Sequence, residues 1–156
     1  MSSNTTAPYA LLAGENPVFL AYVTWACILG IKMLLMSPLT GTFRVKNAAF
    51  ANPEDLPKQT TELKTDEQVE RVRRAHLNDM ENILPFLTIG LIYVLTNPNP
   101  MIAIILFRVA GTVRIIHTII YAIYPIRQPA RAICFFTCFF ITIYMAVMCI
   151  IRFWFI

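Results

Sequence analysis

The chain has 156 residues, of which 57% are hydrophobic and 14% are charged, with a formal net charge of +4. Soluble domains carry about 25% charged residues, so this composition indicates a single integral membrane domain. The basic residues lie beside apolar runs and form no separate solvated patch, which argues against nucleic acid as a partner.

The first apolar run, 17–36, contains Lys32 as its only charge. A helix of about 20 apolar residues crosses a bilayer core, so we expect a first span at 17–40. The tail before it has no basic region, and a cleaved signal peptide is therefore not expected. Lys32 would be buried as a neutral or a paired amine.

The stretch "ERVRRAHLNDMENILPFL" at 70–87 carries seven ionisable side chains in its first twelve residues and continues without a linker into an apolar run. The apolar part, 83–96, is too short to cross a bilayer alone. It predicts a second span at 70–96 only if the charged residues form its first turns. A hydrophilic loop at 42–69 would join it to the first span.

Two more apolar runs follow, at 101–124 with Arg108 and at 133–151 with no charge at all. Asn-Pro-Asn-Pro at 97–100 is typical of a tight turn, and the two prolines within 124–129 indicate the other short connection. Together the four spans predict an all-α, integral membrane, antiparallel four-helix bundle. The predicted spans are 17–40, 70–96, 101–124 and 130–153.

Basic residues in the short connections set the orientation of such a bundle. The turn at 97–100 and the N-terminal tail hold none, so we expect the loop to face the cytosol and both termini to face the lumen. The sequon at Asn4 would then be lumenal. The basic residues of the loop and the start of the second span are Arg44, Lys46, Lys58, Lys64, Arg71, Arg73 and Arg74.

The four cysteines all lie in apolar runs. With none in a loop, the sequence predicts neither a disulfide framework nor a metal site. Cys134 and Cys138 share a helix face, but cysteine commonly serves as a small apolar filler. We therefore expect all four to be inert packing residues.

Ionisable residues inside a span are costly and indicate function by default. Arg74, Asn78 and Glu81 follow the spacing i, i+4, i+7 and share one face of the second helix. An alternative interpretation is structural: Arg74 would pair with Glu81 or Glu70, and the neighbouring arginines would be interfacial anchors.

The third helix has a similar polar face at the same depth, formed by Arg114, His117 and Tyr121. These residues lie within about 15 Å of the predicted cytosolic end, and Arg131 begins the fourth helix at that level. A structural pair of Glu81 with Arg114 is one interpretation. A polar pocket for an anionic or zwitterionic ligand better explains two polar faces at one depth.

The same segments carry a family resemblance. The stretch at 70–87, "FANPEDL" at 50–56, "RIIHTIIY" at 114–121 and "QPAR" at 128–131 occur in the order found in the membrane-associated proteins in eicosanoid and glutathione metabolism. Within this family the chain most resembles the type-1 branch of the microsomal glutathione S-transferases. The prostaglandin E synthase branch is similar but more distant.

The resemblance implies a homotrimer of four-helix subunits in the endoplasmic reticulum membrane, and also in the mitochondrial outer membrane, with glutathione bound between subunits near the cytosolic side. Arg131 would be the catalytic residue that stabilises the thiolate, Asp55 would be a secondary polar candidate, and no metal would be required. By motif match, the glutathione-binding residues would be Arg44, Arg73, Arg74, His76, Asn78, Glu81, Arg114, His117 and Tyr121.

The chemistry of glutathione suits these residues. Arginines bind carboxylates through paired hydrogen bonds, Glu81 can take the ammonium group, and stabilising the thiolate by two pKa units requires about 2.7 kcal/mol. The implied reaction is conjugation of glutathione to hydrophobic electrophiles, with peroxidase activity on lipid hydroperoxides that arrive through the membrane lipid.

Two other functions stay open. A glutathione-dependent isomerase of the prostaglandin E synthase kind is disfavoured by Leu77 and Ala132, which replace an arginine and a serine of that branch. A non-catalytic membrane binding or regulatory protein is the alternative from another class. Leu56 stands where mammalian members of the transferase branch have a loop cysteine, so we expect no reactive thiol in this loop.

Overall fold

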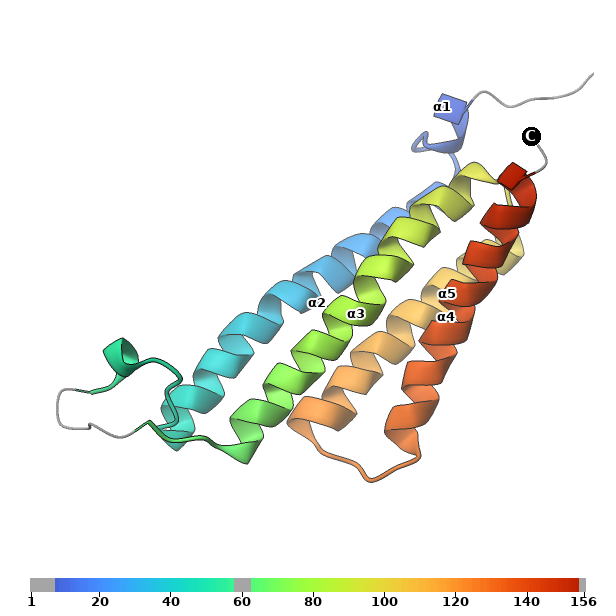
Figure 1. Cartoon of the computed structure of the whole chain (residues 1–156). Helices are drawn as coiled ribbons and strands as arrows, with labels where there is room; N and C mark the ends of the chain where they lie inside the picture. Colours follow the sequence, from blue (N-terminus) through green and yellow to red (C-terminus); the bar gives the residue numbers. More distant parts are fainter. Residues whose placement is uncertain (1–7, 58–62, 155–156) are drawn as a thin grey trace, which may run out of the picture.

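The computed structural model describes residues 8–57 and 63–154. Over this part of the chain every regular element is a helix (Figure 1), which confirms the predicted all-α class. In chain order the elements are α1 (Pro8–Leu11), α2 (Pro17–Asn47), the short 3-10 helix η1 (Pro53–Asp55), α3 (Glu67–Leu95), α4 (Pro100–Thr118), the π-helix η2 (Ile119–Ile123) and α5 (Ala130–Trp154).

The four long helices run alternately up and down (Figure 1), with α2 packed on α3 and α4, and α5 packed on the same two helices. Short α1 lies at one end of this bundle together with the turn between α3 and α4. The described connecting residues 48–57 and 63–66, together with the connection 124–129, lie at the opposite end, which we call the loop end.

Three of the helices are long and apolar enough to cross a bilayer: α2, the continuous α4–η2 rod over Pro100–Ile123, and α5. Helix α3 does not meet this criterion because its first turns are charged. The charged stretch and the apolar run nevertheless form one continuous helix of 29 residues, about 43 Å long.

The loop predicted at 42–69 is shorter than expected, because α2 continues to Asn47 and α3 begins at Glu67. The helix ends at Ala48, whose left-handed backbone (φ 48°) lets its N–H bond back to the last turn. Arg44 therefore belongs to the last turn of α2 and not to the loop.

Asp66 links the two helices that flank this loop. Its carboxylate caps α3 by accepting hydrogen bonds from the backbone N–H groups of Gln68 and Val69. It also accepts a bond of 2.7 Å from the side-chain amide of Asn47, at the end of α2. This amide, more than the two backbone N–H groups, lowers the pKa of Asp66 below its ordinary value.

The turn between α3 and α4 follows the predicted Asn-Pro chemistry. Asn97 takes a left-handed conformation (φ 53°), which asparagine tolerates better than most residues. Asn99 caps α4 by accepting bonds from the N–H groups of Met101 and Ile102, and Pro100 occupies the first turn.

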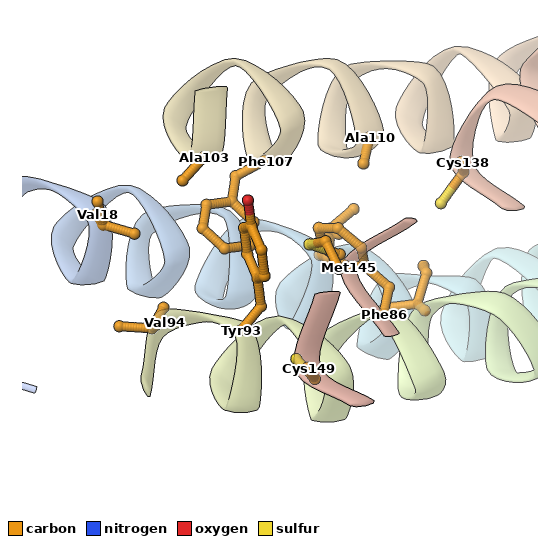
Figure 2. Packing of buried hydrophobic residues seen from close by; sticks show 12 residues of the cluster. Val18, Phe86, Tyr93, Val94, Ala103, Phe107, Ala110, Cys138, Met145 and Cys149 are labelled. Carbon is orange, nitrogen blue, oxygen red and sulfur yellow. The ribbon is translucent and has the colours of Figure 1, made fainter. Parts of the chain in front are cut away.

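Most of the apolar core surrounds Phe107 on α4. Tyr22, Phe86 and Tyr93 meet its ring edge to face at 5.7–6.4 Å, and Figure 2 shows the rings of Tyr93 and Phe107 lying against each other. Between helices in lipid, association depends on such close packing and on polar contacts more than on the hydrophobic effect. One polar cluster interrupts this core toward the loop end.

Candidate functional site

The polar cluster centres on Asp79 of α3, which is bound from two other helices. Lys32 of α2 and Arg114 of α4 both form ion pairs with its carboxylate, and the Thr118 hydroxyl donates to Oδ2 at 3.2 Å. One carboxylate thus joins α2, α3 and α4 in the middle of the bundle.

The cluster is buried and carries an excess of positive charge. The side chains of Asp79 and Arg114 are 0% exposed, and that of Lys32 is 13% exposed. Two cations share one carboxylate, while Nε and Nη1 of Arg114 have no hydrogen-bond partner among the described residues. Arg114 also donates to Oδ1 of Asn78 at 3.1 Å, which connects the cluster to a half-buried residue of α3.

The proposed structural pair of Glu81 with Arg114 is wrong, because the partner of Arg114 is Asp79. The sequence did not predict a role for Asp79, because the polar face predicted on this helix contains Asn78 and Glu81 and Asp79 lies on a different face. The signal was present, since Ala75, Asp79 and Ile83 are spaced i, i+4, i+8 and are all buried. A carboxylate inside an apolar helical stripe needs a buried partner. Lys32, expected as either a neutral or a paired amine, is such a partner.

The opposite face of α3 carries ion pairs that stay within the helix. Arg73 donates to Glu70 at 2.8 Å and Arg74 donates to Glu67 at 2.6 Å. The predicted pairing of Arg74 with Glu70 or Glu81 is therefore wrong, and Glu67, two turns earlier, takes that role. Both arginine side chains remain about half exposed, at 53% and 48%.

A cavity of about 380 Å³ lies on this face of α3. All of its lining residues belong to the one helix, so no other described element of the chain covers it. The cavity brings together three of the predicted ligand-binding residues, Arg73, Arg74 and His76. It includes His76 although this residue does not share the helix face of Arg74, Asn78 and Glu81. The lining residues are Glu70, Arg73, Arg74, His76, Leu77 and Met80.

Glu81 is exposed near the middle of α3 and forms no ion pair with the described residues. Its carboxylate is therefore available to a ligand. Asn78 lies one turn before it and is half-buried.

Arg131, Tyr121 and His117 form a second group at the loop end, contributed by α5, η2 and α4. The Arg131 guanidinium lies 4.4 Å from the centre of the Tyr121 ring, a cation–π distance. The His117 ring meets the same tyrosine edge to face at 5.5 Å. His117 is buried, and its Nδ1 atom has no partner in the part of the chain that the structure describes, whereas Arg131 and Tyr121 are half-buried.

Arg44 lies apart from that group, in a cavity of about 230 Å³ between α2, the loop and α3 that also contacts Arg73. The Nε atom of Arg44 is buried and has no hydrogen-bond partner within residues 8–57 and 63–154. Asp55, the secondary candidate, is exposed in η1 and accepts a bond from Asn52 at 3.0 Å. No described contact joins Asp55 to the other candidate residues.

The cysteines differ in burial. Cys134, Cys138 and Cys149 are buried, as expected for packing residues, but Cys27 is exposed on α2 and is not packed inside this subunit. In the described part of the chain no three His, Cys, Asp or Glu side chains are placed to bind one metal ion.

These features define a class: a four-helix integral membrane protein with cationic and aromatic side chains gathered toward one end of the bundle. The chain belongs to the MAPEG family, whose model matches residues 22–151. It is 47% identical to human microsomal glutathione S-transferase 1 over 138 residues, which cover 85% of this chain and 88% of that protein.

Other relatives fall into the same two branches that the sequence motifs indicated. The microsomal glutathione S-transferase 1 of Rattus norvegicus is 46% identical over 138 residues, covering 85% of this chain and 88% of the relative. The prostaglandin E synthase of Rattus norvegicus is 41% identical over 134 residues, covering 83% and 88%. Both branches therefore share almost the whole described bundle with this chain.

Proposed function

We propose that this protein is a membrane-bound glutathione transferase that joins the glutathione thiolate to hydrophobic electrophiles and reduces lipid hydroperoxides. The main support is the 47% identity to human microsomal glutathione S-transferase 1 over most of both chains. The cavity on α3 is compatible with this function, because two arginines line it and arginine binds carboxylates through paired hydrogen bonds.

In this proposal, Arg73 and Arg74 bind carboxylates of glutathione and Glu81 binds its ammonium group. Arg131 lies beside the thiol and stabilises its thiolate, since a fixed guanidinium in a low-dielectric site favours the charged form. The thiolate sulfur then attacks the electrophilic carbon, a C–S bond forms, and the leaving group departs with the bonding electron pair.

The peroxidase reaction would use the same thiolate. Its sulfur attacks the distal oxygen of the lipid hydroperoxide, the O–O bond breaks and the lipid alcohol is released after protonation. A second glutathione then displaces water from the resulting sulfenic acid and forms glutathione disulfide. Two thiols are oxidised for each hydroperoxide reduced.

A homotrimer is part of the proposal because the resemblance implies one, and the cavity on α3 is open on a side that none of the described helices of its own chain covers. A neighbouring subunit would close it and could present the Arg44 of its own α2. The remaining features of the proposal follow the resemblance: α3 as a spanning helix, a cytosolic site, and residence in the endoplasmic reticulum membrane, with the mitochondrial outer membrane as a second location.

The test is turnover of 1-chloro-2,4-dinitrobenzene and cumene hydroperoxide by the purified protein in detergent, together with a calorimetric titration of glutathione. Binding with turnover of either substrate supports the proposal. Binding without turnover of either would favour the non-catalytic alternative, and no binding would overturn the proposal.

The 41% identity to a prostaglandin E synthase supports one second candidate, a glutathione-dependent isomerase. Leu77 and Ala132 argue against it, because their side chains are apolar where the isomerase branch has an arginine and a serine. Incubation with prostaglandin H2 and glutathione decides this, and a rate of prostaglandin E2 formation above the buffer rate would favour the isomerase.

A further inference from the structure

Asn78 lies between the buried charge cluster and the exposed face of α3. Its side chain is half-buried, while Arg74 one turn before it and Glu81 one turn after it are exposed. Its Oδ1 atom accepts a hydrogen bond of 3.1 Å from Nη2 of Arg114, a side chain that is 0% exposed. The inner side of the Asn78 amide is therefore in contact with the cluster.

The chemistry of arginine decides which way the Asn78 amide faces. A guanidinium group only donates hydrogen bonds, so the amide atom that faces it has to be the carbonyl oxygen. The NH2 group then lies on the side of the amide away from Arg114. Since Arg114 is buried and Asn78 is half exposed, this is the side that shares its helix face with Arg74 and Glu81.

Arg114 is itself held in place by Asp79. The same Nη2 atom that donates to Asn78 also donates to Oδ1 of Asp79. The other oxygen of Asp79 accepts from Lys32 and Thr118, on α2 and α4. Arg114 can leave Asn78 only by breaking its buried ion pair, which is costly.

We propose that Asp79, acting through Arg114, holds the Asn78 amide with its NH2 group toward the candidate site, so that Asn78 donates to an anionic group of glutathione. Asp79 and Arg114 are then positioning residues, and Arg114 need not touch the ligand. This inference rests on the proposed function for the identity of the ligand. The anionic group is a carboxylate or the thiolate.

The first test is Asn78→Asp. It keeps the size of the side chain and replaces the NH2 donor with a carboxylate oxygen, which can only accept a hydrogen bond. One carboxylate oxygen would accept from Arg114 and offset the excess positive charge of the cluster, so the midpoint of thermal unfolding should not fall. The other oxygen would face an anion where an N–H group had donated. Glutathione affinity should therefore fall by roughly tenfold or more.

The second test is Arg114→Gln, which leaves Lys32 paired one to one with Asp79 and so avoids an uncompensated buried carboxylate. A glutamine can either donate or accept, so the Asn78 amide is no longer held in one orientation. Asn78 itself is intact, and its contribution to binding should nevertheless be reduced.

The readout that separates positioning from mere stability is discrimination between ligands. Calorimetry gives the affinities of the unaltered protein and of both variants for glutathione, glutathione diethyl ester and S-methylglutathione. The preference for glutathione over one analogue should shrink by roughly tenfold in both variants. A smaller preference over the diethyl ester assigns the Asn78 contact to a carboxylate. A smaller preference over S-methylglutathione assigns it to the thiolate.

Asn82→Asp is the matched control, because it introduces the same group one turn further along α3, at a residue whose amide donates to the Asn78 backbone carbonyl. It should lower thermal stability and leave the ligand preference of the folded fraction unchanged. If the unaltered protein does not bind glutathione, the proposed function fails. If it binds, and Asn78→Asp and Arg114→Gln fold but keep the full preference over both analogues, the positioning role is overturned.

Discussion

Helix α3 carries charged residues on two faces, and the two faces use the same groups in different ways. On the inner face, Asp79 is 0% exposed and binds cations from two other helices. On the outer face, Glu67 and Glu70 bind arginines of their own helix, and all four side chains remain at least 37% exposed. The inner carboxylate ties helices together, whereas the outer arginines remain accessible to a ligand.

The physical difference between the two faces is the cost of removing charge from water. A buried ion has lost its hydration and depends on its protein partners. An exposed ion pair is still hydrated, so its net contribution to stability is about 0–1 kcal/mol. Substitutions on the inner face should therefore cost more stability than substitutions on the outer face.

The largest effect is expected for Asp79→Asn. It leaves Lys32 and Arg114 buried without a carboxylate, which should lower the free energy of unfolding by roughly 3–5 kcal/mol. The measurement is the thermal unfolding midpoint in detergent, together with the yield of monodisperse protein. Glu67→Gln on the outer face is the matched control and should cost less than about 1 kcal/mol. Equal losses in the two variants would remove the distinction between the faces.

Arg131→Ala tests the group that lies between these extremes, half-buried against Tyr121. If Arg131 stabilises the thiolate, kcat should fall by about 100-fold, while the dissociation constant for glutathione changes only a few-fold. Arg131→Lys should recover part of the rate, because an ammonium group lacks the planar guanidinium fork. Ultraviolet thiolate absorbance of the bound complex measures the step directly, and undiminished absorbance in Arg131→Ala would sink the assignment.

Glu81→Gln separates a ligand contact from a structural role on the outer face. Glu81 forms no ion pair with the described residues of its own chain, so unfolding of the subunit should change little. Loss of the ammonium partner should raise the dissociation constant for glutathione by roughly tenfold. Calorimetry measures the affinity, and size-exclusion chromatography reports assembly. Unchanged binding with loss of assembly would instead assign Glu81 to a subunit contact.

The smallest effect is expected from N-ethylmaleimide. This reagent extends the comparison of buried with exposed groups from charged side chains to cysteine thiols. Cys27 is the exposed cysteine, but it lies on an apolar helix suited to spanning a bilayer and not in the loop. Alkylation should leave transferase activity roughly unchanged. In Leu56→Cys, mass mapping should find label at the new loop thiol. A several-fold activation of the unaltered protein would show that one of its four cysteines is accessible and coupled to the site.

Much of the fold could be predicted because helical membrane proteins reveal their elements locally. Apolar length located α2, α4 and α5, and Asn-Pro chemistry located the turn before α4. Helix ends were less predictable: α2 continues to Asn47 because capping at Ala48 and the contact of Asn47 with Asp66 determine where it ends. Those contacts depend on the two helices meeting, which no local pattern reports.

The sequence by itself determined the class, the four helices and the family, because hydropathy, turn residues and long motifs are properties of short segments. The family motif also singled out Arg73, Arg74 and His76 as ligand residues, and all three line one cavity on α3. Only the tertiary structure decided that Asp79, and not Glu81, pairs with Arg114 and Lys32. Residues 47 positions apart meet through the packing angles and rotations of whole helices, and these depend on all the side chains between them at once.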